Sequence, residues 1–173
     1  MRALPRCSAF LAASLDGFIA RADGGLDWLA PFQTPGEDYG YQAFADACDA
    51  VVIGRKTYDV VLGFGDAAWP YHRKRTIVLT HRATAPRHGE ELIAATPVEA
   101  AARLRDCKRA YIDGADVIRQ FLAAGLLYDL TLSIIPILLG DGVRLFTLCN
   151  EAKLVLDDAR SYPSGLVQLR YHL

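Results

Sequence analysis

The residues best suited to chemistry in this sequence follow a short apolar run at 51–53. Gly54 comes next, and Arg55, Lys56 and Thr57 then open a predicted helix. The free N–H groups and the positive dipole end of a helix start attract phosphate, and two cations and a hydroxyl stand at this one. The stretch is therefore a candidate seat for nucleotide phosphates. An ordinary strand, turn and helix with a basic first turn fits the spacing equally well.

The same arrangement occurs again later in the chain. Gly114 follows an apolar run at 109–113 and precedes a predicted helix, which Gly125 ends. In open α/β sheets, ligands bind beyond the carboxyl ends of the strands. Two such turns side by side can span a pyrophosphate, which is a more specific signal than either turn alone.

Polar side chains at two other places are candidate ligand contacts. A β-branched run at 76–80 ends at Thr80, and Arg82 comes just after it. These two residues either hold another phosphate or form an ordinary solvated strand end. Asp38 stands at the start of a predicted helix, 37–48. It either faces a cleft as proton donor or substrate anchor, or simply stabilises the positive end of the helix dipole.

The elements that must position these residues alternate along the chain, and the pattern predicts an α/β domain that covers residues 1–173. The apolar runs predict strands at 8–14, 18–20, 51–53, 76–80, 92–95, 109–113, 126–139, 143–146, 152–156 and 165–173. Helical spacing and capping signals predict helices at 37–48, 55–62, 97–106 and 115–124. Residues 26–40 form a predicted loop whose aromatic side chains either close over a cleft or cover core.

Composition narrows the class of protein. The 173 residues are 52% hydrophobic and 23% charged, which is enough apolar material for one packed core. The 19 lysines and arginines nearly balance the 20 acidic residues, so general nucleic-acid binding is not expected. No apolar stretch approaches the ~18 residues of a membrane helix, and Asp16 ends the short run 7–15 that faintly resembles a signal peptide.

The cysteines are Cys7, Cys48, Cys107 and Cys149. They are scattered, without a C-x-x-C pair or a nearby histidine pattern, so neither a metal site nor a disulfide framework is expected. Reduced thiols in a cytoplasmic protein are the plain interpretation. The H-x-E and P-C-x-x-C signature of zinc deaminases is also missing from the sequence.

Five stretches in this order resemble the dihydrofolate-reductase-like superfamily: S-A-F-L-A-A-S-L-D-G, V-V-I-G-R-K-T-Y, T-I-V-L-T, Y-I-D-G-A-D-V-I-R-Q-F-L and I-P-I-L-L-G-D-G-V-R-L-F. The chain is most similar to the riboflavin-biosynthesis reductase domain, the C-terminal domain of bacterial deaminase-reductases. The resemblance implies a three-layer α/β fold. Its central sheet is mixed and mostly parallel, with a C-terminal antiparallel hairpin and helices on both faces. NADPH as hydride donor, a small heterocyclic substrate and a homodimer are also implied.

The resemblance also implies roles for individual residues. It assigns the first phosphate turn to Gly54, Arg55, Lys56 and Thr57, and the 2′-phosphate to Thr80 and Arg82. It assigns the second phosphate turn to Asp113, Gly114, Ala115, Asp116, Val117 and Ile118, and the neighbours of the nicotinamide to Ala12, Ala13 and Ile19. The candidate catalytic or substrate contacts are Asp16, Asp38 and Ser133.

Departures from the family pattern leave alternatives open. Asp113 replaces a usual glycine, and a carboxylate near phosphates is unfavourable unless it points away or caps the helix. Phe18 replaces a common basic residue, which weighs against a ribose-phosphate substrate. The first hypothesis is a reductase resembling 5-amino-6-(5-phosphoribosylamino)uracil reductase. The second is a folate-reductase-like enzyme for a pterin or other heterocycle, with Asp38 as anchor. The third is a nucleotide-binding protein without catalysis.

Overall fold

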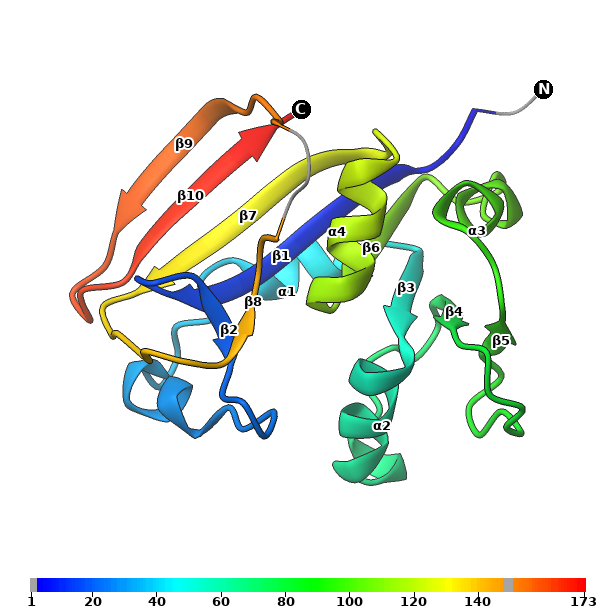
Figure 1. The fold of residues 1–173 in the computed structure, drawn as a ribbon, viewed down its shortest axis with the longest axis horizontal. Coiled ribbons are helices and arrows are strands. Elements are labelled where there is room, and N and C mark those ends of the chain that lie inside the picture. The colour runs from blue at the N-terminus through cyan, green and yellow to red at the C-terminus, as the bar shows by residue number, and fades with distance from the viewer. Residues whose placement is uncertain (1–2, 148–150) are drawn as a thin grey trace.

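Parallel pairing dominates the main sheet of the computed structural model, which describes residues 3–147 and 151–173 (Figure 1). The strand order is β5-β4-β3-β6-β1-β7-β10-β9. These strands are β1 (Arg6–Ser14), β3 (Ala50–Gly54), β4 (Arg75–Leu79), β5 (Glu91–Ile93), β6 (Arg109–Asp113), β7 (Leu127–Ile135), β9 (Val155–Ser161) and β10 (Val167–His172). All neighbours from β5 to β7 run parallel, whereas β10 runs antiparallel to both β7 and β9. The predicted mixed sheet with a C-terminal hairpin is confirmed.

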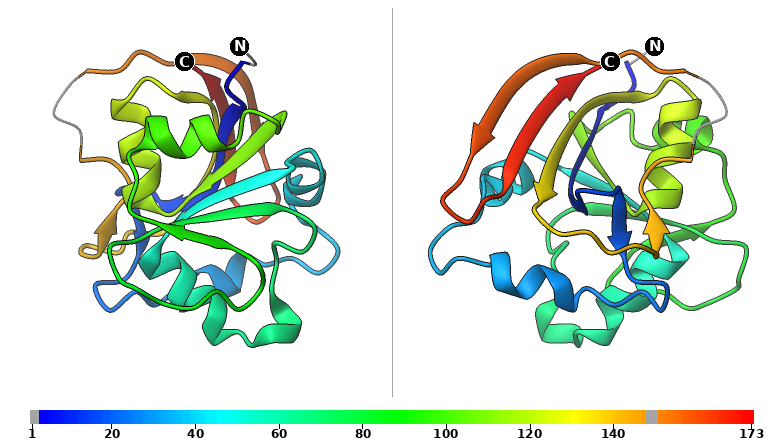
Figure 2. Two further views of the ribbon diagram at one scale, coloured as in Figure 1. Left: turned by 90° about the vertical axis from the view of Figure 1, so that its right-hand side faces the viewer. Right: turned by 60° about the vertical axis from the view of Figure 1, so that its left-hand side comes forward.

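Helices cover both faces of the sheet (Figure 2). They are α1 (Tyr41–Asp46), α2 (Arg55–Gly63), α3 (Pro97–Arg103) and α4 (Ala115–Ala123), with 3₁₀ turns η1 (Asp27–Phe32) and η2 (Asp66–Ala68). One core packs α3 and α4 on one face, around the fully buried Leu104 and Phe121. The other core packs α1 and α2 on the opposite face, around Phe44 and Tyr58. The three-layer arrangement is therefore confirmed as well.

Local sequence signals explain several element boundaries. Thr96 Oγ1 accepts the Glu99 N–H at 3.3 Å, and the Glu99 carboxylate accepts the Thr96 N–H at 2.8 Å, so the predicted capping box begins α3. The apolar run 126–139 is a strand only as far as Ile135, because Pro136 has no N–H to give to the ladder. The predicted turn at 162–165 joins β9 to β10.

Other predicted boundaries are wrong. The first helix begins at Tyr41 rather than 37, because Gly40 takes a φ of +81° and interrupts helical backbone. The segment 143–146 yields the short β8 (Val143–Arg144), which pairs with β2 (Phe18–Ala20) in a separate two-stranded sheet. The edge strand lies at Val155–Ser161 rather than 152–156, because its register is set by pairing with β10. The helix α3 also ends at Arg103, before the expected 106.

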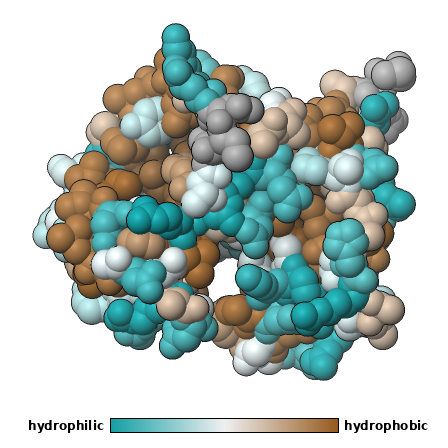
Figure 3. All heavy atoms as spheres, viewed as in Figure 1, coloured by the Kyte–Doolittle hydropathy of each residue, from teal (hydrophilic) through white to brown (hydrophobic). Residues whose placement is uncertain are grey.

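Apolar side chains gather on the surface over β9 and β10, at the left of Figure 3. Val155 and Leu156 on the edge strand are 55% and 53% exposed. Among the described residues, no helix has the length and apolar character to cross a membrane, and no cluster of metal-ligating side chains occurs. Cys7, Cys48 and Cys107 carry free thiols, and Cys149 lies outside the described residues.

Candidate cofactor and substrate site

The two glycine turns of the sequence meet at the carboxyl ends of neighbouring parallel strands. Ile53 of β3 pairs with Asp113 of β6, so Gly54 and Gly114 leave the sheet together. A Cβ atom on Gly114 would lie 2.4 Å from Thr57 Oγ1 of α2. One on Gly54 would lie 3.1 Å from a methyl group of Val117 in α4. The starts of α2 and α4 are therefore in contact, and both direct free N–H groups to the same edge of the sheet.

The loop after β4 is fastened to α2 beside these turns. Arg55 Nη1 donates to Thr84 Oγ1 at 2.6 Å, and Arg55 Nε donates to Asp59 at 2.8 Å. The Tyr58 hydroxyl donates to the buried carboxylate of Glu90, which also accepts two backbone N–H groups of the same loop. These bonds hold the loop that carries Thr80 and Arg82 close to the first turn.

Lys56, in the first turn of α2, and Arg82 carry no ion pair within residues 3–147 and 151–173, and both are exposed. The Thr80 hydroxyl accepts the Arg82 N–H at 3.1 Å. Free N–H groups, a hydroxyl and unpaired cations are the donors that phosphate oxygens require, so these residues fit a phosphorylated dinucleotide.

The carboxylate of Asp113 is engaged by donors of its own turn and of Tyr71. One carboxylate oxygen accepts the Gly114 N–H at 2.8 Å, and the other accepts the Tyr71 hydroxyl at 3.1 Å. Desolvation raises the pKa of Asp113, and its charge also helps to raise the pKa of Tyr71. Asp113 therefore caps the turn that precedes α4, which is one of the two conditions under which a carboxylate is compatible with a phosphate site. Its other oxygen binds the neutral hydroxyl of Tyr71.

Most of the remaining residues of the second turn have buried side chains. Ala115, Val117 and Ile118 are on the buried face of α4, whereas Asp116 is exposed and paired with Arg119. Ala13 lies in the same core, and Ile19 packs against its edge. The buried side chains of Ala13, Ala115, Val117 and Ile118 leave only their main chain for contact with a cofactor.

A cavity of about 250 Å³ lies over β1 and β7, on the face opposite α4. We call it the ring cavity, and its walls include Ala12, Leu29, Phe32, Asp38, Tyr41 and Ser133. It thus brings together three residues that the sequence predicts as ligand contacts: Ala12, Asp38 and Ser133. The Ser133 hydroxyl is within 3.1 Å of Gln168 Nε2, which donates to it.

The Asp38 carboxylate stabilises the start of α1, as one interpretation of the sequence expects, and it also lines the ring cavity. It accepts the N–H groups of Gln42 at 2.8 Å and Gly40 at 2.9 Å, and these bonds lower its pKa. An ionised carboxylate is suited to accept N–H groups from a ring rather than to donate a proton.

Tyr41 is a cavity residue that the sequence pattern did not single out, because its helical spacing indicated only core packing. Its ring lies 5.6 Å from that of Phe10, centroid to centroid. Burial raises its pKa, so the hydroxyl remains protonated at neutral pH.

Asp16 does not line the ring cavity. Its carboxylate accepts the Ser14 hydroxyl at 2.6 Å and the N–H groups of Leu139 at 3.1 Å and Gly140 at 2.8 Å. The bond from Ser14 is the main reason that the pKa of Asp16 falls from 3.8 to about 2. Asp16 therefore joins the end of β1 to the loop that follows β7.

We expect Asp16→Asn to lower the melting temperature at neutral pH, because the amide replaces an ionised acceptor of three hydrogen bonds. A lowered native pKa stabilises the fold above pH 3.8, and this contribution disappears as pH falls through about 2. The gap between wild type and variant should narrow between pH 4 and pH 2 in calorimetry. Asp46→Asn, on the exposed end of α1, is the control, and a gap independent of pH would contradict the assignment.

We expect Gly114→Ala to destabilise the protein by about 2–5 kcal/mol, from backbone strain at φ +87° and overlap with Thr57 Oγ1. Adding Thr57→Ala should recover the share of the lost stability that is due to overlap with Thr57 Oγ1. The share that is due to backbone strain should remain. Gly63→Ala is the matched control, since open space surrounds that position. Urea unfolding measures all four proteins, and equal stability of the Gly114 and Gly63 variants would show that the turns do not meet.

Comparisons with known proteins agree with this architecture. The family described as the RibD C-terminal domain matches residues 5–168. The uncharacterized protein YwjB of Bacillus subtilis (strain 168) is 34% identical over 167 residues, with 94% of each chain covered. A putative riboflavin biosynthesis protein from Shewanella sp. PV-4 has a TM-score of 0.88 at 34% identity, covering 96% of this chain and 98% of that one.

Dihydrofolate reductase from Enterococcus faecalis, complexed with NADP(H), shares the fold. Its TM-score is 0.63 at 16% identity, with 96% of this chain and 95% of that one covered. The fold is thus dihydrofolate-reductase-like, as the sequence motifs predict. Because the match to the family extends over nearly all of the sequence, the chain belongs to the RibD C-terminal domain family.

Proposed function

We propose that the protein is an NADPH-dependent reductase of the riboflavin-biosynthesis type, acting on a small heterocycle. The observation that carries this proposal is the contact between the Gly54 and Gly114 turns, on the sheet that also forms the ring cavity. Membership of the RibD C-terminal domain family supports the same reaction class. The most direct candidate substrate resembles 5-amino-6-(5-phosphoribosylamino)uracil.

The two turns and the loop after β4 bind different phosphate groups of the cofactor. The free N–H groups at the starts of α2 and α4 bind the pyrophosphate, with Lys56 beside them. Arg82 and Thr80 bind the 2′-phosphate, because a cation and a hydroxyl select a dianion over a ribose hydroxyl. When bound, the cofactor supplies hydride to an electron-poor carbon, and the protein supplies orientation and electrostatics.

In the ring cavity, the polar contacts with the substrate heterocycle come from Asp38, Ser133 and Tyr41. Asp38 is ionised and accepts ring N–H groups, whereas the protonated Tyr41 hydroxyl is able to donate to a ring oxygen or nitrogen. The apolar side chains of Leu29 and Phe32 exclude water from the ring. The carboxylate of Asp38 favours, as a second candidate, reduction of a pterin or a related heterocycle.

Phe18 motivates the third alternative, a nucleotide-binding protein without catalysis. Its ring is buried, and the Arg144 guanidinium lies 4.7 Å from the ring centroid. A cation is thus present near the place where family members carry a basic residue, although it comes from β8. This arrangement weighs against the third alternative.

Titration with NADPH and NADH tests the proposal. We expect NADPH to bind more tightly, and Arg82→Gln to weaken NADPH about tenfold or more while leaving NADH unchanged. Arg103→Gln, an exposed arginine on α3, is the control. Calorimetry measures each affinity, and failure of both cofactors to bind the wild-type protein would refute both reductase hypotheses and favour the third.

A substrate screen then separates the two reductase hypotheses. NADPH oxidation is followed at saturating cofactor with a ribityl- or ribosyl-aminopyrimidine and with dihydrofolate. Turnover of dihydrofolate that Asp38→Asn abolishes, with cofactor affinity intact, would favour the pterin candidate. Turnover of the pyrimidine alone would favour the riboflavin-type candidate.

A homodimer is part of the proposal. The exposed apolar side chains of Val155 and Leu156 on an edge strand support it, because such an edge is usually covered by another chain. Sedimentation equilibrium should give twice the 19.0 kDa mass of the chain. A mass of one chain at micromolar concentration would contradict this part.

A further inference from the structure

A second, larger cavity lies next to the ring cavity on the same face of the sheet. Its volume is about 460 Å³, and Phe10 and Tyr39 belong to the walls of both cavities. Its floor is the polar face of β7 and β10, where Thr131 pairs with Arg170. None of the tasks proposed above uses this cavity.

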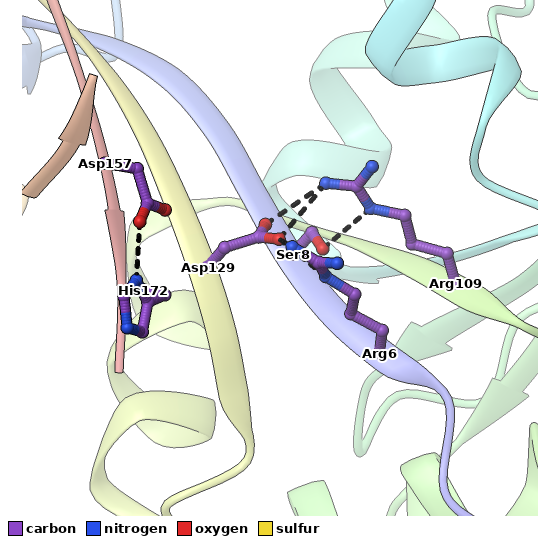
Figure 4. A network of polar contacts seen from close by, with 6 residues as sticks. All are labelled: Arg6, Ser8, Arg109, Asp129, Asp157 and His172. Carbon is purple, nitrogen blue, oxygen red and sulfur yellow. Dashed lines mark hydrogen bonds and ion pairs between the residues drawn. The ribbon is translucent and has the colours of Figure 1, made fainter. Parts of the chain in front are cut away.

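Arg109 at one side of the larger cavity is held rigidly. Its Nε donates to Ser8 Oγ at 2.9 Å, its Nη2 donates to Asp129 at 3.2 Å, and its guanidinium lies 4.9 Å from the Phe44 ring centroid. Figure 4 shows the third nitrogen, Nη1, pointing away from this network, and it has no hydrogen bond to the described residues. This donor is therefore preorganised and still available.

The buried Asp129 does not cancel the charge of Arg109. Arg6 also pairs with this carboxylate, so two guanidinium groups share a single negative charge (Figure 4). The Asp129 side chain is only 5% exposed, which keeps the network in place. An excess positive charge is therefore fixed beside the cavity.

The opposite side of the larger cavity carries Arg170 and Arg160. Arg160 pairs with Asp158 at 2.9 Å, whereas Arg170 has no ion pair in the described parts of the chain. The other acidic lining residue, Glu37, accepts the Tyr39 N–H at 2.7 Å. Three arginines thus line the cavity against two carboxylates, both of which already have donors.

Gln168 connects the two cavities. Its Nε2 donates to Ser133 Oγ of the ring cavity at 3.1 Å and to the Tyr39 carbonyl at 3.0 Å, while its side chain lines the larger cavity. Tyr39 itself has a φ of +55° and is fixed by a 2.6 Å hydrogen bond from its hydroxyl to the Phe32 carbonyl. A ligand in the ring cavity can therefore extend past Gln168 toward the arginines.

We propose that the larger cavity binds the anionic group, a phosphate or a carboxylate, of the molecule whose ring occupies the ring cavity. Arg170 and Arg109 are its ligands, from β10 and β6, and Thr131 adds a hydroxyl. Two guanidinium groups with free donors form charge-assisted hydrogen bonds to such an oxyanion. The identity of the ring site rests on the proposed function, whereas the anion site rests on the cavity and its arginines.

Three ligands with one ring test the anion site: uridine, uridine 5′-monophosphate and uridine 5′-carboxylate. Calorimetry measures their binding to the wild type and to Arg170→Gln, a change at an exposed side chain outside the buried network. We expect an anionic ligand to bind the wild type about tenfold or more tightly than uridine, and Arg170→Gln to remove this difference. The better of the two anionic ligands identifies the oxyanion.

Two control variants separate this site from the cofactor turns. Arg103→Gln, on α3, should keep the full preference for the anion. Lys56→Gln should also keep it, because its cation belongs to the first phosphate turn. Loss of the preference in Lys56→Gln but not in Arg170→Gln would place the anion at the cofactor turns and overturn the proposal. Equal affinity for all three ligands, or no binding of either anionic ligand, would overturn it too.

NADPH titration of the same samples keeps the two proposals distinguishable. Arg170→Gln should bind NADPH like the wild type. A wild-type protein that prefers the anion but binds no NADPH would support the anion site and refute the reductase proposal. NADPH binding without the Arg170-dependent preference would refute only the anion site.

Discussion

The contact between two glycine turns is the constraint on which the rest of this structure depends. Parallel pairing of β3 with β6 brings Gly54 and Gly114 to one edge of the sheet, and no side chain fits between Gly114 and Thr57. The starts of α2 and α4 therefore lie together and direct their N–H groups the same way. The loop after β4 is held beside these turns, because Arg55 and Tyr58 of α2 form hydrogen bonds with it.

Two carboxylates of the sheet are engaged by donors of their neighbours. Asp113, the acidic residue nearest the turns, gives its oxygens to Gly114 and Tyr71, and its desolvation raises its pKa. On the open face of the sheet, Asp129 likewise serves two arginines and leaves an excess of positive charge. In both places the oxygens of a carboxylate are already occupied by hydrogen-bond donors of its neighbours.

Successive side chains of β1 point to opposite faces of the sheet. Ala13 faces the core beneath α4, whereas Ala12 faces the ring cavity on the other side of the sheet. The short α1 covers only part of that second face, because Gly40 delays its start to Tyr41. The face beyond it remains open, and the ring cavity and the larger cavity lie there side by side.

The sequence by itself determined the layered α/β fold, both glycine turns, the capping box of α3 and the family, because each depends on local backbone preference or on residue order. It also predicted Asp38 and Ser133 as ligand contacts, and the structure places both in the wall of one cavity. Only the tertiary structure decided that Asp16 binds the loop after β7, that Asp113 accepts hydrogen bonds from Gly114 and Tyr71, and that Arg109 and Arg170 line one cavity. These outcomes depend on strand register and on contacts between residues far apart in the chain, which composition and spacing do not encode.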